Sequence, residues 1–256
     1  AYAVRLDTES PAVRLTNRTG FHAMTSSKNC KFIADSFSSV DSPPEVKLLK
    51  FDPKMLQMPG EDSGHLLFRE SLPSGLADLI RIPELGSFTG PSGDKIHCAV
   101  YKPPASFGPG PHPLIVEVYG GPHVQRVTNS FNVTVGSMRR QYLSQQGFVV
   151  AICDNRGSSR RGLAFEGHIK HCMGTVEVDD QVAFVQWLAS RKIADPTRVG
   201  VYGWSYGGYL SAMALAKYPS VFKAAVAGAP VTSWDGYDTH YTERYMGSPQ
   251  ENPLGY

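Results

Sequence analysis

The sequence has no long apolar run, no basic block and no clustered cysteines. No apolar stretch approaches the roughly 18 residues that a membrane-spanning helix needs, so we expect no membrane association. The net charge is only +2 over 256 residues, and without a basic block nothing indicates nucleic acid as a partner.

The sequence also gives little indication of a metal site or of disulfide bonds. The four cysteines, Cys30, Cys98, Cys153 and Cys172, lie far apart, which fits neither a small disulfide framework nor a zinc site. We therefore expect reduced thiols. The stretch HIKHC places two histidines three residues apart, but no third ligand is evident, and we expect neither a metal nor a cofactor.

Residues 1 to about 50 have the pattern of a β-rich region. Strand-like runs such as CKFIADSFSS and EVKLLKF alternate with polar and proline-containing turns, a spacing that suits a sheet protein such as a propeller. No complete repeat is present. Residues 52–80 contain three prolines and resemble a connector.

From about residue 84 the pattern changes to alternating buried strands and helices. GSFTGPSGDKIHCAVYKP is typical of two strands around a turn, and LIVEVYGGP and FVVAICD are continuous apolar runs of the kind found in fully buried strands. TVEVDDQVAFVQWLASRK has apolar residues at a spacing close to 3.6. This alternation predicts a parallel α/β sheet with helices on both faces.

The motif GWSYGG places Ser205 between Gly203 and Gly207. A strand-like run, RVGVYG, precedes it, and the helix-forming GYLSAMALAKYP follows. Strand, tight turn and helix in this order form a nucleophile elbow, in which the serine hydroxyl is exposed above the sheet. The flanking glycines are needed because side chains there would collide with the neighbouring strand and helix. A structural turn is the alternative, but the context favours Ser205 as a nucleophile on an α/β-hydrolase fold.

Several stretches together resemble one family. VYGGPHVQRVTNSF, DNRGSSRRGLAFEG, GTVEVDDQ, GWSYGGYLS and GAPVTSWDGYDTHYTERYMG are similar to the prolyl oligopeptidase family of serine peptidases, within it to the dipeptidyl peptidase IV subfamily, and most to its intracellular branch of dipeptidyl peptidases 8 and 9. The resemblance is strong over residues 84–256 and loose over residues 1–80. It implies a cytoplasmic serine-type dipeptidyl aminopeptidase that releases N-terminal dipeptides with Pro or Ala in the second position. It also implies a homodimer for the full-length protein.

The resemblance assigns roles to particular residues. Ser205 matches the nucleophile, the backbone N–H of Tyr206 one oxyanion-hole donor, and the hydroxyl of Tyr119 the second donor. A phenol held near the serine would stabilise charge that develops in the transition state. The residues that match the pocket for the side chain before the cleaved bond are Val231, Trp234, Tyr237 and Tyr241.

Two of these assignments have alternatives in which the residues have only a structural role. Read from the residues alone, Tyr119 is a core tyrosine at a strand end. The aromatic spacing Trp234, Tyr237, Tyr241 fits one face of a helix, which is more often core than pocket. Arg156, Glu177, Asp179 and Asp180 match family positions too, and we interpret them as ion-pair or capping residues.

A peptidase of this type also needs an acid and a histidine, in the chain order Ser, Asp, His. After Ser205 the only histidine is His240, preceded by Asp235 and Asp238, and all three lie inside the pocket segment. We therefore expect a fragment at both ends: residues 1–80 are the C-terminal part of a propeller-like domain with a connector. Residues 81–256 are then the N-terminal part of an α/β-hydrolase domain, truncated before the catalytic Asp and His and inactive alone.

Two other functions stay open at this point. One is an oligopeptidase, acylaminoacyl peptidase or esterase on the same fold. The other is a catalytically silent interaction module, against which the intact Gly-Trp-Ser-Tyr-Gly argues.

Overall fold

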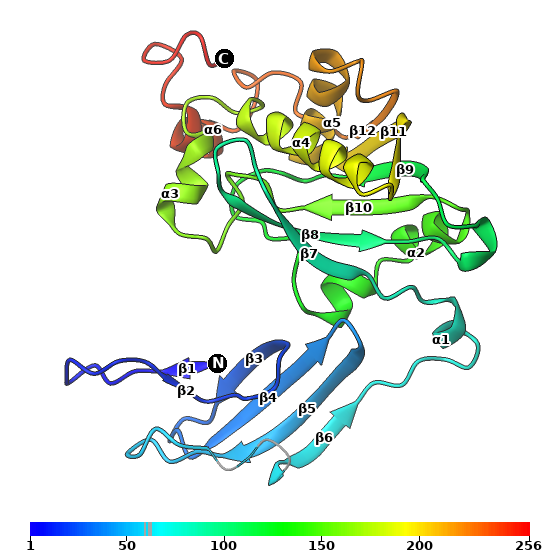
Figure 1. Ribbon diagram of the computed structural model, residues 1–256. Coiled ribbons are helices and arrows are strands. Elements are labelled where there is room, and N and C mark those ends of the chain that lie inside the picture. The colour runs from blue at the N-terminus through cyan, green and yellow to red at the C-terminus, as the bar shows by residue number, and fades with distance from the viewer. Residues whose placement is uncertain (59, 61–62) are drawn as a thin grey trace. The chain divides into compact units, whose positions relative to one another are not determined.

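The computed structural model describes residues 1–58, 60 and 63–256, and the chain divides into two compact units (Figure 1). The first unit comprises Ala1–Ile82 and Thr128–Ser137, and the second comprises Pro83–Val127 and Met138–Tyr256. The inclusion of residues 128–137 in the first unit was not predicted from the sequence.

The first unit is built around a four-stranded antiparallel sheet in which the strands follow one another in sequence order. Its strands are β3 (Phe21–Ser26), β4 (Phe32–Ser39), β5 (Ser42–Lys50) and β6 (His65–Arg69). The remaining elements are the short pair β1 (Tyr2–Ala3) and β2 (Val13–Arg14), the helix α1 (Leu76–Leu79) and the π-helical turn η3 (Phe131–Val135). The predicted β-rich character of this region is confirmed, whereas a propeller is not tested by one sheet.

The second unit contains a six-stranded sheet in the order β12-β11-β9-β10-β8-β7. Its strands are β7 (Glu84–Thr89), β8 (Lys95–Tyr101), β9 (His112–Glu117), β10 (Val149–Cys153), β11 (Ala194–Trp204) and β12 (Ala224–Gly228). Strands β9 to β12 are parallel, but β8 is antiparallel to both β7 and β10. The prediction of a parallel sheet is therefore wrong at this edge, because the short turn between β7 and β8 can join only antiparallel strands.

Helices lie on both faces of this sheet, as predicted, but they cover the two faces unequally. On one face α4 (Val176–Ser190) and α5 (Tyr206–Lys217) pack over the core of the unit (Figure 1). On the opposite face α2 (Met138–Gln145) contacts β8 and β10. The shorter helices are η2 (Ala105–Phe107), α3 (Leu163–Glu166), η4 (Gly167–Ile169) and α6 (Thr239–Met246).

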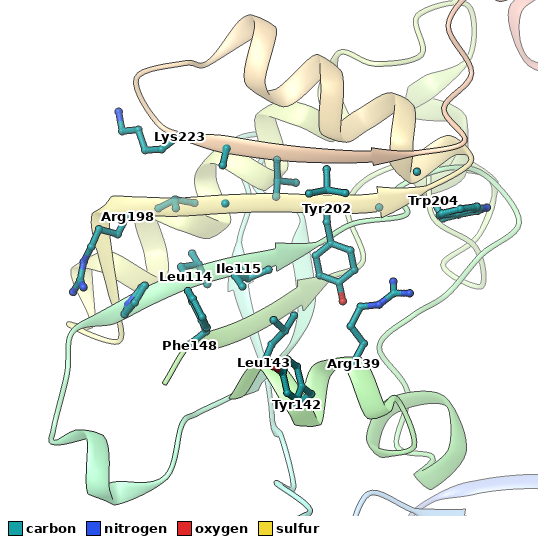
Figure 2. A pocket seen from close by; sticks show the side chains of 18 residues that line it. Leu114, Ile115, Arg139, Tyr142, Leu143, Phe148, Arg198, Tyr202, Trp204 and Lys223 are labelled. Carbon is teal, nitrogen blue, oxygen red and sulfur yellow. The ribbon is translucent and has the colours of Figure 1, made fainter. Parts of the chain in front are cut away.

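The second face is open beside α2, over strands β9, β11 and β12. The hollow has a volume of about 850 Å³. Ile115, Leu143 and Tyr202 project into it (Figure 2). The exposed fractions of Trp204 and Val226, both on these strands, are 65% and 68%. The prediction of helices on both faces therefore holds for only part of the sheet.

A buried charge cluster fixes the end of β9 against α2. Glu117 accepts hydrogen bonds from Arg140 at 2.6 and 2.8 Å and is also paired with Arg126 and the hydroxyl of Tyr202. Burial alone would raise the pKa of Glu117, but the hydrogen bonds and positive charge of Arg140 hold it at about 2. The carboxylate is thus ionised at neutral pH, and it anchors the strand that ends two residues before Tyr119.

Two further expectations concern membranes and thiols. Within the part of the chain that the structure describes, no helix combines the length and the apolar character required to cross a membrane. All four cysteines are free in the structure.

Candidate active site

Ser205 occupies a strained turn between β11 and α5. Its backbone has φ 58° and ψ −119°, a conformation that costs a residue with a side chain about 1–3 kcal/mol. The turn is held on both sides: Ser205 N–H donates to the carbonyl of Gly228 (2.9 Å), and Tyr209 N–H donates to the carbonyl of Ser205 (3.0 Å). The strand–turn–helix order predicted for the motif is confirmed.

The two flanking glycines allow the turn to lie directly against the end of β9. A Cβ atom at Gly203 would lie 2.3 Å from the carbonyl oxygen of Val118, and one at Gly207 would lie 2.1 Å from the same oxygen. Both distances are far inside van der Waals contact, so the close approach expected at these glycines is confirmed. The contact brings the elbow next to Tyr119, whose Cα would lie 3.0 Å from that second Cβ.

Tyr119 follows β9 and is half-buried beside the elbow. Its ring centroid lies 6.0 Å from that of Tyr206. Burial, and then the neighbouring Tyr237 and Tyr245, raise the pKa of Tyr119 above its ordinary value. The hydroxyl is therefore protonated at neutral pH and is available as a hydrogen-bond donor.

Tyr206 is the first residue of α5, and only 1% of it is exposed. Backbone N–H groups in the first turn of a helix have no partner within the helix, so this N–H is free to bind an anion. The side chain points inward, where its hydroxyl donates to a carboxylate oxygen of Glu177 at 2.6 Å.

An aromatic cluster surrounds Trp234, which is 4% exposed. Its ring lies 5.7 Å from Tyr206, 6.1 Å from Tyr237 and 6.3 Å from Tyr241, and it is stacked on the last of these. Val231 packs against the main hydrophobic core of the unit. The three aromatic residues of the predicted pocket therefore lie in one region beside Tyr206.

The aromatic residues do not share one helix face, contrary to the spacing argument. Helix α6 begins only at Thr239, because Asp238 caps it by accepting a hydrogen bond from Tyr241 N–H (3.2 Å). Trp234 and Tyr237 precede it in an irregular segment. Their contacts with Tyr241 come from a bend in the chain rather than from helical periodicity.

Sequence reasoning missed three members of the cluster. The ring of Tyr209 lies 5.2 Å from that of Trp234. Tyr245 lies one turn beyond Tyr241 on α6, at 5.0 Å between ring centroids, and the ring of His123 lies 5.5 Å from Tyr245. The i, i+4 spacing of the two tyrosines was visible in YTERY, and it could have extended the predicted set.

The polar residues of the pocket segment have local partners. Arg244 donates a hydrogen bond to Nε2 of His240 (2.8 Å), one turn apart on the exposed side of α6. Asp235 is paired with the hydroxyl of Ser233. Nδ1 of His171, from the HIKHC stretch, lies 2.8 Å from the carbonyl oxygen of Met246. Among the described residues there is no group of three or more His, Cys, Asp or Glu that could hold a metal ion.

The acidic residues of α4 have the partners that capping and ion pairing require. Asp180 forms a buried ion pair with Arg156 at 2.7 Å, and Glu177 accepts the N–H groups of Gly174 and Thr175, each at 2.9 Å. The interpretation of Arg156, Glu177 and Asp180 as ion-pair and capping residues is confirmed, whereas Asp179 accepts a hydrogen bond from the hydroxyl of Tyr218. The bond of Glu177 to Tyr206 was not predicted.

Comparison with known proteins finds similarity to a family of peptidases. A sequence model described as the prolyl oligopeptidase family matches residues 134–256. Dipeptidyl peptidase 8 of Mus musculus is 43% identical over 250 residues, which is 95% of this chain and 27% of that protein. Dipeptidyl peptidase 8 of Homo sapiens is 42% identical over 262 residues, which is the whole chain and 28% of that protein.

A solved structure extends the similarity to the fold. A Bacteroides ovatus protein assigned as a dipeptidyl aminopeptidase IV superposes with a TM-score of 0.82 at 36% sequence identity, covering 92% of this chain and 32% of that one. The chain thus spans 27 and 28% of the length of the two curated relatives.

Proposed function

The chain belongs to the prolyl oligopeptidase family of serine peptidases, and from this premise we propose that the full-length protein is a serine-type dipeptidyl peptidase. The observation that carries the proposal is the strained Ser205 elbow packed against the strand end that bears Tyr119. A nucleophile and two potential oxyanion donors thereby meet at one sheet edge.

In the proposed reaction, Ser205 Oγ attacks the carbonyl carbon of the second residue of the peptide, and its proton passes to a general base. The carbonyl oxygen becomes an oxyanion, which accepts hydrogen bonds from Tyr206 N–H and the hydroxyl of Tyr119. Collapse breaks the C–N bond, and the base returns the proton to the leaving amine. Water then hydrolyses the acyl-enzyme, which releases the dipeptide and restores the serine.

The cluster of Val231, Trp234, Tyr237 and Tyr241 is our proposed pocket for the second residue of the substrate. Its contact with Tyr206 through Trp234 supports this placement, because the pocket must adjoin the nucleophile. Aromatic walls without a charged group suit a flat, apolar proline ring or a small alanine. We therefore propose a preference for Pro or Ala in that position.

His240 is not the general base in this proposal, since Nε2 already accepts a hydrogen bond from Arg244. Residues 1–256 by themselves are then expected to be inactive.

We further propose that residues 1–80 are the C-terminal part of a β-propeller domain and its connector. The four antiparallel strands that follow one another in sequence order support this proposal, because a propeller blade is a four-stranded sheet of this kind. The homodimer and the cytoplasmic location stay predictions.

The function is tested with a chromogenic Gly-Pro anilide. The full-length protein is expected to release Gly-Pro and to ignore the same substrate with its amino terminus acylated, because a dipeptidyl peptidase requires a free amine. Residues 1–256 alone serve as the matched sample without a general base. We expect this sample to accelerate hydrolysis by no more than about 10³–10⁴ over water, the residual effect of substrate binding and the oxyanion hole. Faster cleavage of the acylated substrate would favour an acylaminoacyl peptidase or oligopeptidase instead.

The pocket is tested by replacing Trp234 with alanine. The ratio of kcat/KM for Pro over Leu substrates is expected to fall by about 10-fold or more, because a shape-based pocket discriminates by about 1–3 kcal/mol. Tyr142→Ala is the control, since this ring on α2 is 64% exposed and lies outside the cluster. An unchanged ratio in folded Trp234→Ala protein would show that Trp234 belongs to the core and not to the pocket.

A further inference from the structure

Helix α4 carries three buried polar side chains near its N-terminal end. Glu177, Asp180 and Gln181 are each no more than 2% exposed, and their i, i+3, i+4 spacing places them on one face of the helix. Burial of a carboxylate or an amide is unfavourable unless each polar atom finds a partner. Among their partners are Tyr206, at the elbow, and Asn155, which is bonded to the turn after Tyr119.

Glu177 is hydrogen-bonded to Tyr206, the residue after the elbow serine. One carboxylate oxygen accepts the Tyr206 hydroxyl at 2.6 Å and the N–H of Gly174 at 2.9 Å, and the other accepts the N–H of Thr175 at 2.9 Å. Burial raises the pKa of Glu177, while these hydrogen bonds favour the ionised form. With three donors in fixed directions, the carboxylate can hold the Tyr206 side chain in one position.

Gln181 is connected to the turn after Tyr119 through the side chain of Asn155. Its amide Nε2 donates to Oδ1 of Asn155 at 2.9 Å, and Asn155 Nδ2 donates to the carbonyl of Gly120 at 2.9 Å. Asp180 fixes the same segment, because it accepts the backbone N–H of Arg156 at 2.8 Å. Gly120 directly follows Tyr119, so this chain of bonds reaches the second donor residue.

We propose that Glu177, Gln181 and Asn155, which we call the α4 brace, are positioning residues that set the separation of the two oxyanion donors. The inference rests on the proposed function, since it assumes that Tyr206 N–H and the Tyr119 hydroxyl bind the oxyanion. Tyr119 follows strand β9, whereas Tyr206 begins the helix that follows β11. The two strands are paired, and attachment of the Tyr206 side chain and of the turn after Tyr119 to one turn of α4 adds a second link between the two donor residues.

The energetic reason for such a brace is preorganisation. Oxyanion donors stabilise the transition state because they already point at the place where charge develops, and a misplacement of about 1 Å can cost about 10²-fold in rate. The brace touches neither the substrate nor the reacting atoms. Its loss should therefore lower transition-state binding and leave substrate binding intact.

The brace is tested in the full-length protein with Tyr206→Phe and Gln181→Met. Tyr206→Phe keeps the backbone N–H and deletes only the bond to Glu177, which itself stays in place to cap α4. Gln181→Met retains side-chain length and deletes the bond to Asn155. Each variant is expected to lower kcat by about 10–100-fold with KM changed less than twofold. Affinity for a dipeptide boronic acid, which forms a tetrahedral adduct with the serine, should fall by a similar factor.

A matched control is available on the same two helices. The hydroxyl of Tyr218, at the end of α5, donates to Asp179 of α4 at 2.6 Å. Tyr218→Phe removes a bond of the same kind between α5 and α4 but far along the helix from the elbow. We expect this variant to keep wild-type kcat and boronate affinity, whatever its effect on the thermal midpoint.

The outcomes separate the brace from the function on which it rests. The brace alone would be overturned if the wild type is active and both folded variants, Tyr206→Phe and Gln181→Met, retain kcat and boronate affinity within twofold of Tyr218→Phe. A loss expressed as a raised KM with unchanged kcat would also overturn it. A wild-type protein that neither hydrolyses Gly-Pro anilide nor binds the boronate would overturn the proposed function, and the brace with it.

Discussion

Replacement of Ser205 by alanine in the full-length protein is expected to lower kcat for Gly-Pro release by about 10⁶-fold, as loss of a nucleophilic serine does in other serine peptidases. Alanine keeps the backbone of the strained turn at φ 58° possible and leaves both donors in place. The loss would therefore report the missing hydroxyl rather than a collapsed site. It is measured as single-turnover and steady-state hydrolysis of the Gly-Pro anilide.

A second serine provides the control. Ser190, at the exposed end of α4, donates its hydroxyl to the carbonyl of Trp187, and Ser190→Ala is expected to keep wild-type kcat. Residual activity of Ser205→Ala above about 1% of wild type, in protein free of contaminating peptidase, would contradict the assignment, because another group would then perform the attack.

Replacement of Tyr119 by phenylalanine is expected to lower kcat by about 10²–10³, which corresponds to about 2.7–4 kcal/mol of transition-state stabilisation. KM should change little, because the hydroxyl is proposed to bind the oxyanion and not the ground-state carbonyl. The ring stays, so its contact with Tyr206 is preserved. The two constants are measured separately over a range of Gly-Pro anilide concentrations.

Tyr142→Phe, which removes a hydroxyl from an exposed ring on α2, is the control and should behave as wild type. An increase in KM with unchanged kcat would place Tyr119 in substrate binding. Wild-type values of both kcat and KM would indicate that Tyr119 is a core tyrosine without a role in catalysis.

The elbow could be predicted from the sequence because its determinants are local. A β-branched run, a glycine-flanked serine and a helix-forming run follow one another within about 20 residues, and each fixes its own backbone conformation. The antiparallel edge was mispredicted although its determinant is also local, because the short turn between β7 and β8 can join only antiparallel strands.

The contacts behind the site could not be predicted because they join residues distant in sequence. The bond from Tyr206 to Glu177 spans 29 positions and that from Gln181 to Asn155 spans 26, and no periodicity encodes such pairs. Three aromatic residues of the cluster, Trp234, Tyr237 and Tyr241, were predicted, but their geometry was not, because the cap at Asp238 delays the start of α6. Spacing alone cannot distinguish one helix face from a bend that brings the same rings together.

The central claim, that Ser205 is an activated nucleophile, is tested most directly by covalent labelling. Full-length protein is treated with a fluorophosphonate probe, digested, and examined by mass spectrometry, with Ser205→Ala protein in parallel. The account predicts that the adduct is carried by Ser205, disappears in the Ser205→Ala variant and is blocked by prior addition of the dipeptide boronic acid. Absence of labelling in folded wild-type protein, or an adduct on a different serine, would contradict it and favour a catalytically silent module on the same fold.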